Sequence, residues 1–183
     1  MRQQFSADVR INGIITDGGQ SAGIIPERAA ARFNVGCLDY DQQRALFTQV
    51  QGCATAASQA TGCEVAFEPG ILYREMNLNP SLIALIEDKM WEVGLEVTPP
   101  GFQGGTGGTD VGNVSQITSA DSVWIAMGEH LMPHTPEYRE ACVSEPGHEA
   151  IINGARVGAL LGLELFTRPE ALAKIRRDFE SRR

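Results

Sequence analysis

The chain has 183 residues, 43% of them hydrophobic, and a formal net charge of −8. This length allows one domain or two small ones with a real core, and the negative charge argues against nucleic acid as a partner. No apolar run approaches the roughly 20 residues that a membrane span needs, so we expect no membrane partner.

The cysteines indicate a cellular compartment. The chain has four of them, none forms a C-x-x-C pair, and residues 1–10 are polar, unlike a secretory signal. This pattern argues against a zinc ribbon and against thioredoxin-like chemistry. We therefore expect reduced, mostly buried cysteines and a cytoplasmic location.

The first 70 residues are predicted to contain three strands. Apolar and polar residues alternate over 7–16 and again over 28–35, which is the period of a half-buried strand. The apolar residues at alternate positions of 63–67 predict the third strand in the same way.

A long helix is predicted between the second and third strands. Asp39 is a favourable N-cap residue, and Gln42 follows it in the capping-box position. The helix should run to about Gln59 and end at Gly62. One helix lying over an antiparallel sheet is an α+β arrangement.

The next segment should begin with a helix and continue to a buried strand. Asn79 and Pro80 supply an N-cap followed by proline at the first helical position, and Gly94 marks the end of this helix. The short apolar run over 122–127 is typical of a buried strand.

Two further helices are predicted at the end of the chain. The helix over 146–165 is apolar on almost all sides, with glycine at every fourth position from 154 to 162, which indicates close packing against another element. Thr167 and Glu170 form a capping box for the last helix.

The most informative stretch is glycine-rich and spans 104–115. Glycines let the backbone approach a ligand closely, and successive N–H groups can form a concave anion site. Short polar side chains follow at Thr109, Asp110, Asn113 and Ser115. The stretch is neither a Walker loop nor a dinucleotide fingerprint. Two interpretations remain: a ligand-binding loop, or a plain turn in which Asp110 caps a helix without any ligand.

A histidine in a proline-bounded loop is the candidate metal ligand. His134 lies between Pro133 and Pro136, and loops on a rigid scaffold often carry such residues. We interpret His130 as a loop residue. His148 does not complete the H-E-x-x-H metalloprotease motif, so we expect it to pack at the start of its helix.

Five ordered motifs together carry a family resemblance. The chain resembles the C-terminal part of the zinc-dependent amidohydrolases of the aminoacylase and carboxypeptidase G family, nearest the branch that contains p-aminobenzoyl-glutamate hydrolase and the vertebrate dipeptidase-like proteins. The motifs are GIITDGG at 13–19, IIPE at 24–27, GGTDVGNVSQ at 107–116, HTPEYREA at 134–141 and GHEAIINGA at 147–155.

The resemblance implies an α/β fold in two pieces. Residues 1–70 would be part of an α+β lid, with an antiparallel sheet and a helix, which also forms the family's homodimer. Residues 71–183 would be the C-terminal half of a zinc-exopeptidase-like α/β/α catalytic domain. The half with the His-x-Asp metal pair and the general base would then lie outside this chain.

The resemblance also implies roles for individual residues. Gly107, Gly108, Thr109 and Asp110 would receive the substrate carboxylate, and His134 would correspond to the family's last metal histidine. The family's cofactor is a two-zinc centre, which one histidine does not hold. We therefore expect no catalytic residue in this chain and no zinc held by it alone.

Three positions depart from the family pattern. Asn12 stands where the lid usually has a histidine that polarises the scissile carbonyl, and Gly23 replaces an asparagine. Gly36 replaces an arginine that binds the substrate carboxylate, and a bidentate arginine contact is not replaceable by glycine.

The favoured function is that of a metal-dependent hydrolase. At family level it would cleave amide bonds in N-acyl amino acids, dipeptides or p-aminobenzoyl-glutamate-like substrates, with this chain inactive alone. Its partner would be a second copy bound through the lid, or a companion N-terminal half. The alternative is a non-catalytic remnant or partner subunit that acts through dimer or heteromer contacts of the lid. An unrelated α/β binding domain would require all five motifs to match by accident.

Overall fold

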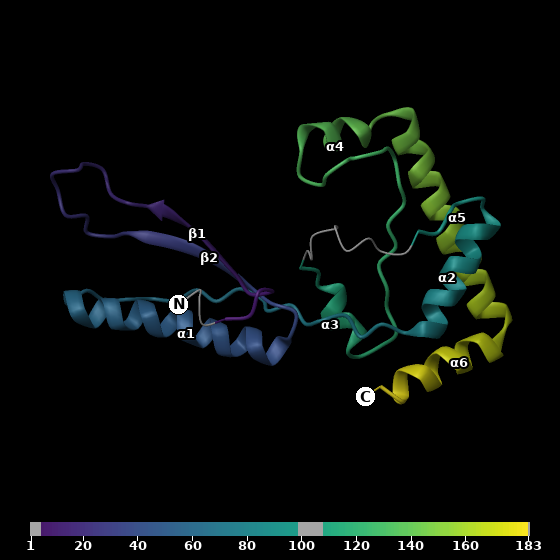
Figure 1. Cartoon of the computed structure of the whole chain (residues 1–183), viewed down its shortest axis with the longest axis horizontal. Coiled ribbons are helices and arrows are strands. Elements are labelled where there is room, and N and C mark those ends of the chain that lie inside the picture. Colours follow the sequence, from purple (N-terminus) through teal and green to yellow (C-terminus); the bar gives the residue numbers. More distant parts are fainter. Residues whose placement is uncertain (1–4, 99–107, 183) are drawn as a thin grey trace. The chain divides into compact units, whose positions relative to one another are not determined.

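The computed structural model describes residues 5–98 and 108–182. The chain divides into two compact units, Met1–Glu75 and Met76–Arg183 (Figure 1). Helices are combined with a small two-stranded antiparallel sheet, so the predicted mixed α/β class is confirmed.

The sheet of the first unit is a hairpin of β1 (Arg10–Asp17) and β2 (Ala30–Gly36), and it confirms the first two predicted strands. The strands pair from Arg10↔Gly36 to Asp17↔Ala30, with one irregularity near Asp17. A Cβ added to Gly13 would overlap the ring of Phe33, its cross-strand partner. The aromatic ring therefore packs directly over glycine backbone.

Helix α1 (Tyr40–Thr61) confirms the predicted long helix. The Asp39 carboxylate accepts a hydrogen bond from the Gln42 N–H at 2.7 Å, and Gly62 ends the helix with φ 73°. The Gln42 side chain donates to the Ser6 hydroxyl at 3.3 Å. The reciprocal half of the predicted capping box is thus absent.

The core of the first unit is small. Leu46 of α1 and Val9 before β1 are fully buried, and the Gln43 amide donates to the Val35 carbonyl at 3.1 Å. Most of the hairpin remains exposed, including Ile14, Ile15, Ile24, Ile25 and Phe33. This unit therefore presents more apolar surface than its own elements cover.

The predicted third strand at 63–67 is wrong. The described residues of this segment form no strand, and Val65 and Phe67 are exposed. The following stretch is held near the start of α1, where the Arg74 guanidinium lies 4.7 Å from the centroid of the Tyr40 ring. An alternating pattern becomes a strand only when a neighbouring strand supplies hydrogen-bond partners.

The second unit is built on three helices: α2 (Pro80–Glu92), α5 (Glu145–Thr167) and α6 (Pro169–Glu180). Two short helices, α3 (Val111–Ser115) and α4 (Pro136–Ala141), lie between them in sequence. The core residues come from all three long helices: Leu82, Ile86, Met90, Val157 and Ile175.

The start of α2 is tied into this core by Asn79, which is 1% exposed. Its side-chain oxygen accepts from the Leu82 N–H at 3.0 Å. Its amide nitrogen donates to the Ser119 hydroxyl and to the Ile175 carbonyl, each at 2.9 Å. The predicted N-cap is therefore confirmed, and it also links α2 to α6.

An ion-pair network joins α2 to α5. The Lys89 ammonium lies 2.9 Å from Glu92 and 3.3 Å from Glu164, and Arg168 lies 2.9 Å from Glu164. The side chains of Lys89 and Glu164 are each only 14% exposed. The hydrogen bond to Glu92, and then the contact with Glu164, raise the pKa of Lys89.

Two predictions for the second unit are wrong. The run over 122–127 belongs to no strand among the described residues. The last helix begins after Arg168 without a side-chain cap, since the Thr167 hydroxyl donates back to the Leu163 carbonyl at 2.7 Å. Threonine near a helix end can satisfy the preceding turn rather than cap the next helix.

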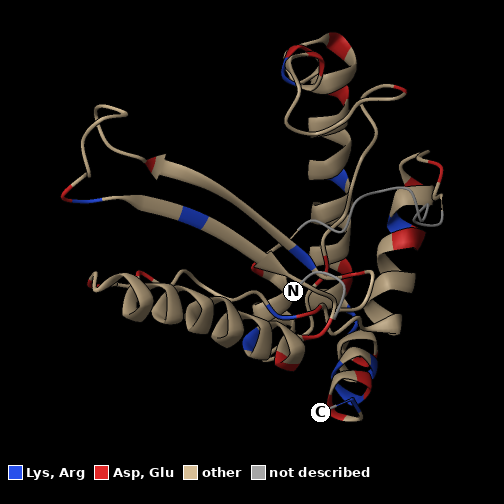
Figure 2. Ribbon diagram, turned by 60° about the vertical axis from the view of Figure 1, so that its left-hand side comes forward, with Lys and Arg blue, Asp and Glu red and all other residues tan. Residues whose placement is uncertain are grey.

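Helix α5 contradicts the expectation that no apolar segment is long enough for a membrane span. Its 23 residues are long and apolar enough to cross a membrane by length and composition alone, although we expected no such run. In Figure 2 the ribbon of this helix has few positions coloured for charged residues, whereas the ribbon of α6 has many. The packed side of α5 contributes Val157 to the three-helix core.

Candidate functional site

The described part of the glycine-rich loop leads directly into α3. Gly108 and Asp110 are exposed and Thr109 is half-buried. The Thr109 hydroxyl accepts from the Val111 N–H at 3.3 Å, whereas the Asp110 side chain makes no capping bond. Thr109 therefore caps the helix, and Asp110 occupies the N-cap position without bonding there. Gly107 lies outside the described residues.

Several backbone N–H groups at this turn are already used. The N–H groups of Gly112 and Asn113 donate to the carbonyls of Thr109 and Asp110, at 3.3 and 2.9 Å. Among the described residues, no hydrogen bond is recorded for the N–H groups of Gly108, Thr109 and Asp110. An incoming anion would meet these three groups.

Ser115 fixes α3 to the beginning of the second unit. It is fully buried, and its hydroxyl accepts from the Asn77 N–H at 2.8 Å and donates to the Gly112 carbonyl at 2.7 Å. Sequence analysis placed Ser115 among candidate polar side chains of the loop. The structure gives it a positioning role instead, since both of its bonds are internal.

His134 adopts an uncommon backbone conformation. It is exposed, with φ 68° in the left-handed region. The next residue, Thr135, caps α4 by accepting from the Tyr138 N–H at 3.2 Å and also donates to the Met132 carbonyl at 2.9 Å. Left-handed backbone at a residue other than glycine is frequently found at functional loops and costs about 1–3 kcal/mol.

The described residues do not assemble a metal centre. Among them, no three His, Cys, Asp or Glu side chains lie close enough to hold an ion. His130 is exposed at φ 56°, and His148 is exposed in the first turns of α5. Zinc generally takes four ligands, or three with a water. The donor set present therefore does not fit zinc without further ligands.

The three departures from the family pattern lie in or beside the hairpin. Asn12 is exposed and pairs across the sheet with Asn34. Gly23 is exposed in the connection, and Gly36 is the last residue of β2. A Cβ added to Gly36 would meet nothing within 4 Å. Lack of space therefore does not explain the glycine at this position.

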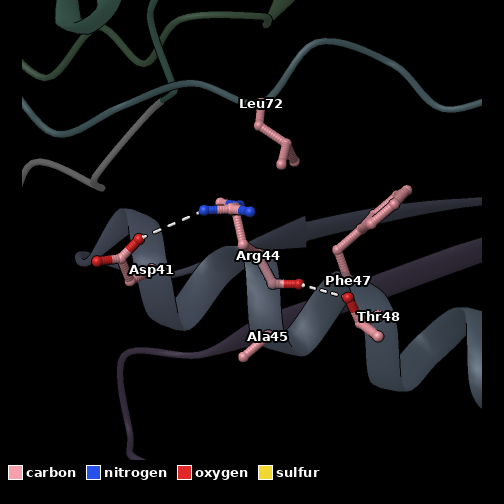
Figure 3. A pocket seen from close by; sticks show the side chains of 6 residues that line it. All are labelled: Asp41, Arg44, Ala45, Phe47, Thr48 and Leu72. Atoms are coloured by element: carbon pink, nitrogen blue, oxygen red, sulfur yellow. Dashed lines mark hydrogen bonds and ion pairs between the residues drawn. The ribbon is translucent and has the colours of Figure 1, made fainter.

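A separate depression lies on α1. It has a volume of about 490 Å³ and is lined by Asp41, Arg44, Ala45, Phe47, Thr48 and Leu72 (Figure 3). The Arg44 guanidinium lies 3.9 Å from the Asp41 carboxylate, and both side chains are mostly exposed. None of the predicted site residues lines it.

The cysteines are less buried than expected. Cys37 is half-buried, and the other three are exposed. Burial raises the pKa of the Cys37 thiol, whose sulfur donates to the Asp39 carbonyl at 3.1 Å. All four are free thiols, and none belongs to a metal-binding cluster among the described residues.

Comparison with known proteins supports a class of hydrolase. The chain is similar over 98% of its length to two curated relatives, and no protein-family model matches it. These relatives are Xaa-Arg dipeptidases. The Homo sapiens protein is 29% identical over 182 residues, and the Mus musculus protein is 27% identical over 183 residues.

The chain spans 42% of the length of each of these relatives. The similarity supports a peptidase family, and at that level a dipeptidase-type hydrolase. It does not select the p-aminobenzoyl-glutamate hydrolase branch.

Proposed function

We propose that this chain forms the substrate-carboxylate side of a metal-dependent dipeptide hydrolase whose metal centre is completed by a companion polypeptide or segment. The observation that carries the proposal is the similarity to Xaa-Arg dipeptidases over nearly the whole chain. The turn before α3 and the strained loop at His134 are the two places where this chain would meet the substrate and the metal.

The substrate's terminal carboxylate would bind at the turn. The N–H groups of Gly108, Thr109 and Asp110 are available there, and Ser115 holds the turn in place from behind. Backbone N–H donors suit a carboxylate because they add no positive side chain that must be desolvated. Gly107 would extend the same cradle by resemblance.

A basic side chain next to that carboxylate would suit the charge of this protein. The net charge of −8 favours the approach of cationic ligands, and Asp110 is exposed beside the proposed carboxylate site. The relatives' name specifies a C-terminal arginine for those proteins. Dipeptides ending in arginine or lysine are therefore the first substrates we propose for this one.

His134 would be one ligand of a zinc centre. Zinc would activate a water for attack on the peptide carbonyl once the remaining ligands are supplied. Since the described residues do not fit zinc by themselves, we assign this chain no catalytic step. Its part is to bind and orient the dipeptide, and we propose the cytoplasm as its location.

The carboxylate site can be tested on the chain alone. Amide resonances of residues 108–110 should shift on titration with alanyl-arginine and saturate. Alanyl-arginine amide, which has no terminal carboxylate, should leave them in place. Equal shifts with both ligands, or no shift with either, would refute the site.

Metal content tests the incomplete centre separately. After dialysis against trace zinc, elemental analysis of the purified chain should find no retained zinc, and alanyl-arginine should not be hydrolysed. One or two zinc ions per chain would show that a site assembles without further ligands, contrary to this proposal.

A second candidate function is that of a non-catalytic partner subunit. It is favoured by Asn12, Gly23 and Gly36, which remove three lid groups that the family uses on its substrate. The exposed apolar residues of the hairpin would then serve contacts with a second copy or another subunit. Replacing Phe33 by serine should disrupt such an assembly in sedimentation experiments. For this second function, the unaltered chain should also fail to bind alanyl-arginine.

A further inference from the structure

The hairpin of the first unit has one face that α1 does not cover. Directly opposite residues of antiparallel strands point to the same side of a sheet, and the side alternates along each strand. Helix α1 packs against β2 (Figure 1), and Ile11 and its partner Val35 are half-buried. The opposite face carries three neighbouring pairs: Arg10↔Gly36, Asn12↔Asn34 and Ile14↔Arg32. We call these six residues the open face of the hairpin.

The open face carries positive charge on a protein that is negative overall. The chain has a net charge of −8, but positions 10–16 and 30–36 contain two arginines and no acidic residue. Both arginines are exposed. Because a local positive potential attracts anions, this face favours an anionic ligand.

Arg10 is held in place by the backbone that precedes β1. Its Nη1 donates to the Ala7 carbonyl at 2.6 Å and to the Val9 carbonyl at 3.4 Å. Among the described residues, no hydrogen bond is recorded for its Nε and Nη2. These two nitrogens form one edge of the planar guanidinium, and such an edge can donate two parallel hydrogen bonds to a carboxylate. Since Nη1 is already anchored, less side-chain entropy is lost when a ligand binds.

Asp8 does not neutralise this guanidinium. Its carboxylate accepts from the Leu38 N–H at 3.3 Å. The hydrogen bond with Ser6, and then the one with Leu38, lower the pKa of Asp8, whereas the charge of Arg10 contributes least. Asp8 is therefore satisfied by its own neighbours and leaves the free edge of Arg10 to a ligand.

Arg32, the other arginine of the open face, lacks these two features. Among the described residues, no hydrogen bond or ion pair is recorded for its side chain, so binding would have to order it entirely. Ile14 stands opposite Arg32, whereas Gly36 stands opposite Arg10. A Cβ added to Gly36 would meet nothing within 4 Å. Arg10 therefore combines an anchored guanidinium with open space for a ligand.

From this geometry we infer that Arg10 binds a second carboxylate of the substrate, in addition to the terminal carboxylate that the turn at 108–110 receives. In a dipeptide, a second carboxylate belongs to an acidic side chain. The preferred substrates are then dipeptides with glutamate or aspartate before the C-terminal basic residue. In naming this substrate class the inference rests on the proposed function.

The test compares glutamyl-arginine with glutaminyl-arginine, which has nearly the same shape without the second carboxylate. In the full 183-residue chain, glutamyl-arginine should shift the Nε–H resonance of Arg10 and saturate. Glutaminyl-arginine should leave that resonance in place. The unaltered chain should bind glutamyl-arginine roughly 10-fold more tightly than glutaminyl-arginine, because a hydrogen-bonded charged pair is lost with the latter.

Variants on the open face separate Arg10 from general charge. Arg10→Gln should bind both dipeptides equally. Arg10→Lys keeps the charge but lacks the paired donors, so it should lose most of the preference. Arg32→Gln removes the same charge from the same face without touching the anchored guanidinium, and it should keep the full preference. Backbone amide resonances of β1 and β2 report whether each variant retains the hairpin.

Several results would overturn the inference. If glutaminyl-arginine shifts the Arg10 resonance as strongly, Arg10 binds the terminal carboxylate instead. If Arg10→Gln keeps the preference with an intact hairpin, or if Arg32→Gln loses it equally, the anchored guanidinium is not its cause. Inorganic phosphate that displaces glutamyl-arginine from Arg10 at a lower concentration would assign the open face to phosphate.

The amides of 108–110 report the proposed function in the same spectra. They should shift with both dipeptides, because both carry a terminal carboxylate. Shifts at 108–110 without any preference that depends on Arg10 would refute only the second carboxylate site. A preference that depends on Arg10 without shifts at 108–110 would refute only the turn as the site of the terminal carboxylate.

Discussion

Replacing Asn79 by alanine should destabilise the second unit far more than an ordinary cap substitution does. The side chain is buried and makes three hydrogen bonds, to the Leu82 N–H, the Ser119 hydroxyl and the Ile175 carbonyl. The cap contributes about 1 kcal/mol, and each of the other two bonds contributes about 1 kcal/mol net. The expected loss is therefore about 3 kcal/mol, or roughly 100-fold in the unfolding equilibrium.

Urea unfolding followed by tryptophan fluorescence and circular dichroism measures this loss. Both tryptophans, Trp91 and Trp124, belong to the second unit, so their signal reports that unit. Ser144→Ala is the matched control, because Ser144 caps α5 by accepting from the Gly147 N–H at 3.3 Å without linking two long helices. It should cost about 1 kcal/mol.

A third variant separates the two roles of Asn79. Asn79→Asp keeps an oxygen that can accept from the Leu82 N–H but removes the two donors. It should be destabilised nearly as much as the alanine variant, since it also buries a carboxylate facing the Ile175 carbonyl. If Asn79→Ala costs no more than Ser144→Ala, the link between α2 and α6 does not stabilise this unit and the reasoning fails.

Three further predictions concern the second unit. Gly147→Ala should cost about 1–3 kcal/mol because its Cβ would overlap the Ala141 carbonyl oxygen and would lie 2.9 Å from the Cys142 carbonyl oxygen. Gly158→Ala should instead raise the melting temperature through about 0.5–1 kcal/mol of helix propensity, because its Cβ would meet nothing within 4 Å. Folding raises the pKa of Lys89, so the ion pair contributes its full stabilisation below the ordinary lysine pKa near 10.4 and loses it as the pH rises further. The difference in unfolding free energy between the unaltered chain and Lys89→Met should therefore shrink above that pH, as measured by urea titration. Ser115→Ala should cost about 1–3 kcal/mol and speed amide exchange of Asn77, and unchanged exchange would contradict the positioning role.

The helices were predictable because their signals are local. Asp39 and Asn79 both cap the helices they were expected to cap, and Gly62 ends α1 in the left-handed conformation that favours glycine. Each of these signals depends on a few consecutive residues. The cap predicted from Thr167 is wrong because the Thr167 hydroxyl donates to a carbonyl of the preceding turn. The sequence pattern does not show which of these two hydrogen bonds the hydroxyl will make.

The strand predictions were correct only where both partner strands are among the described residues. The segments 7–16 and 28–35 found one another and became β1 and β2. The alternating segment 63–67 and the apolar run 122–127 were also expected to be strands, but they have no strand partner among the described residues. Strand propensity expresses how a side chain fits a pleated surface, so it cannot form a strand without a neighbour.

The same reasoning applies to the candidate site. Thr109 makes a hydrogen bond within its own turn, and Ser115 makes one to Asn77 at the start of the second unit. The turn at 108–110 is therefore formed by residues of this unit alone. A metal centre needs ligands from several segments at once. His134 has a left-handed backbone conformation, but no group of three possible ligands forms among the described residues. A companion polypeptide or segment would have to supply those ligands beside His134. Zinc retention should then appear only when that companion is present, and His134→Ala should reduce it.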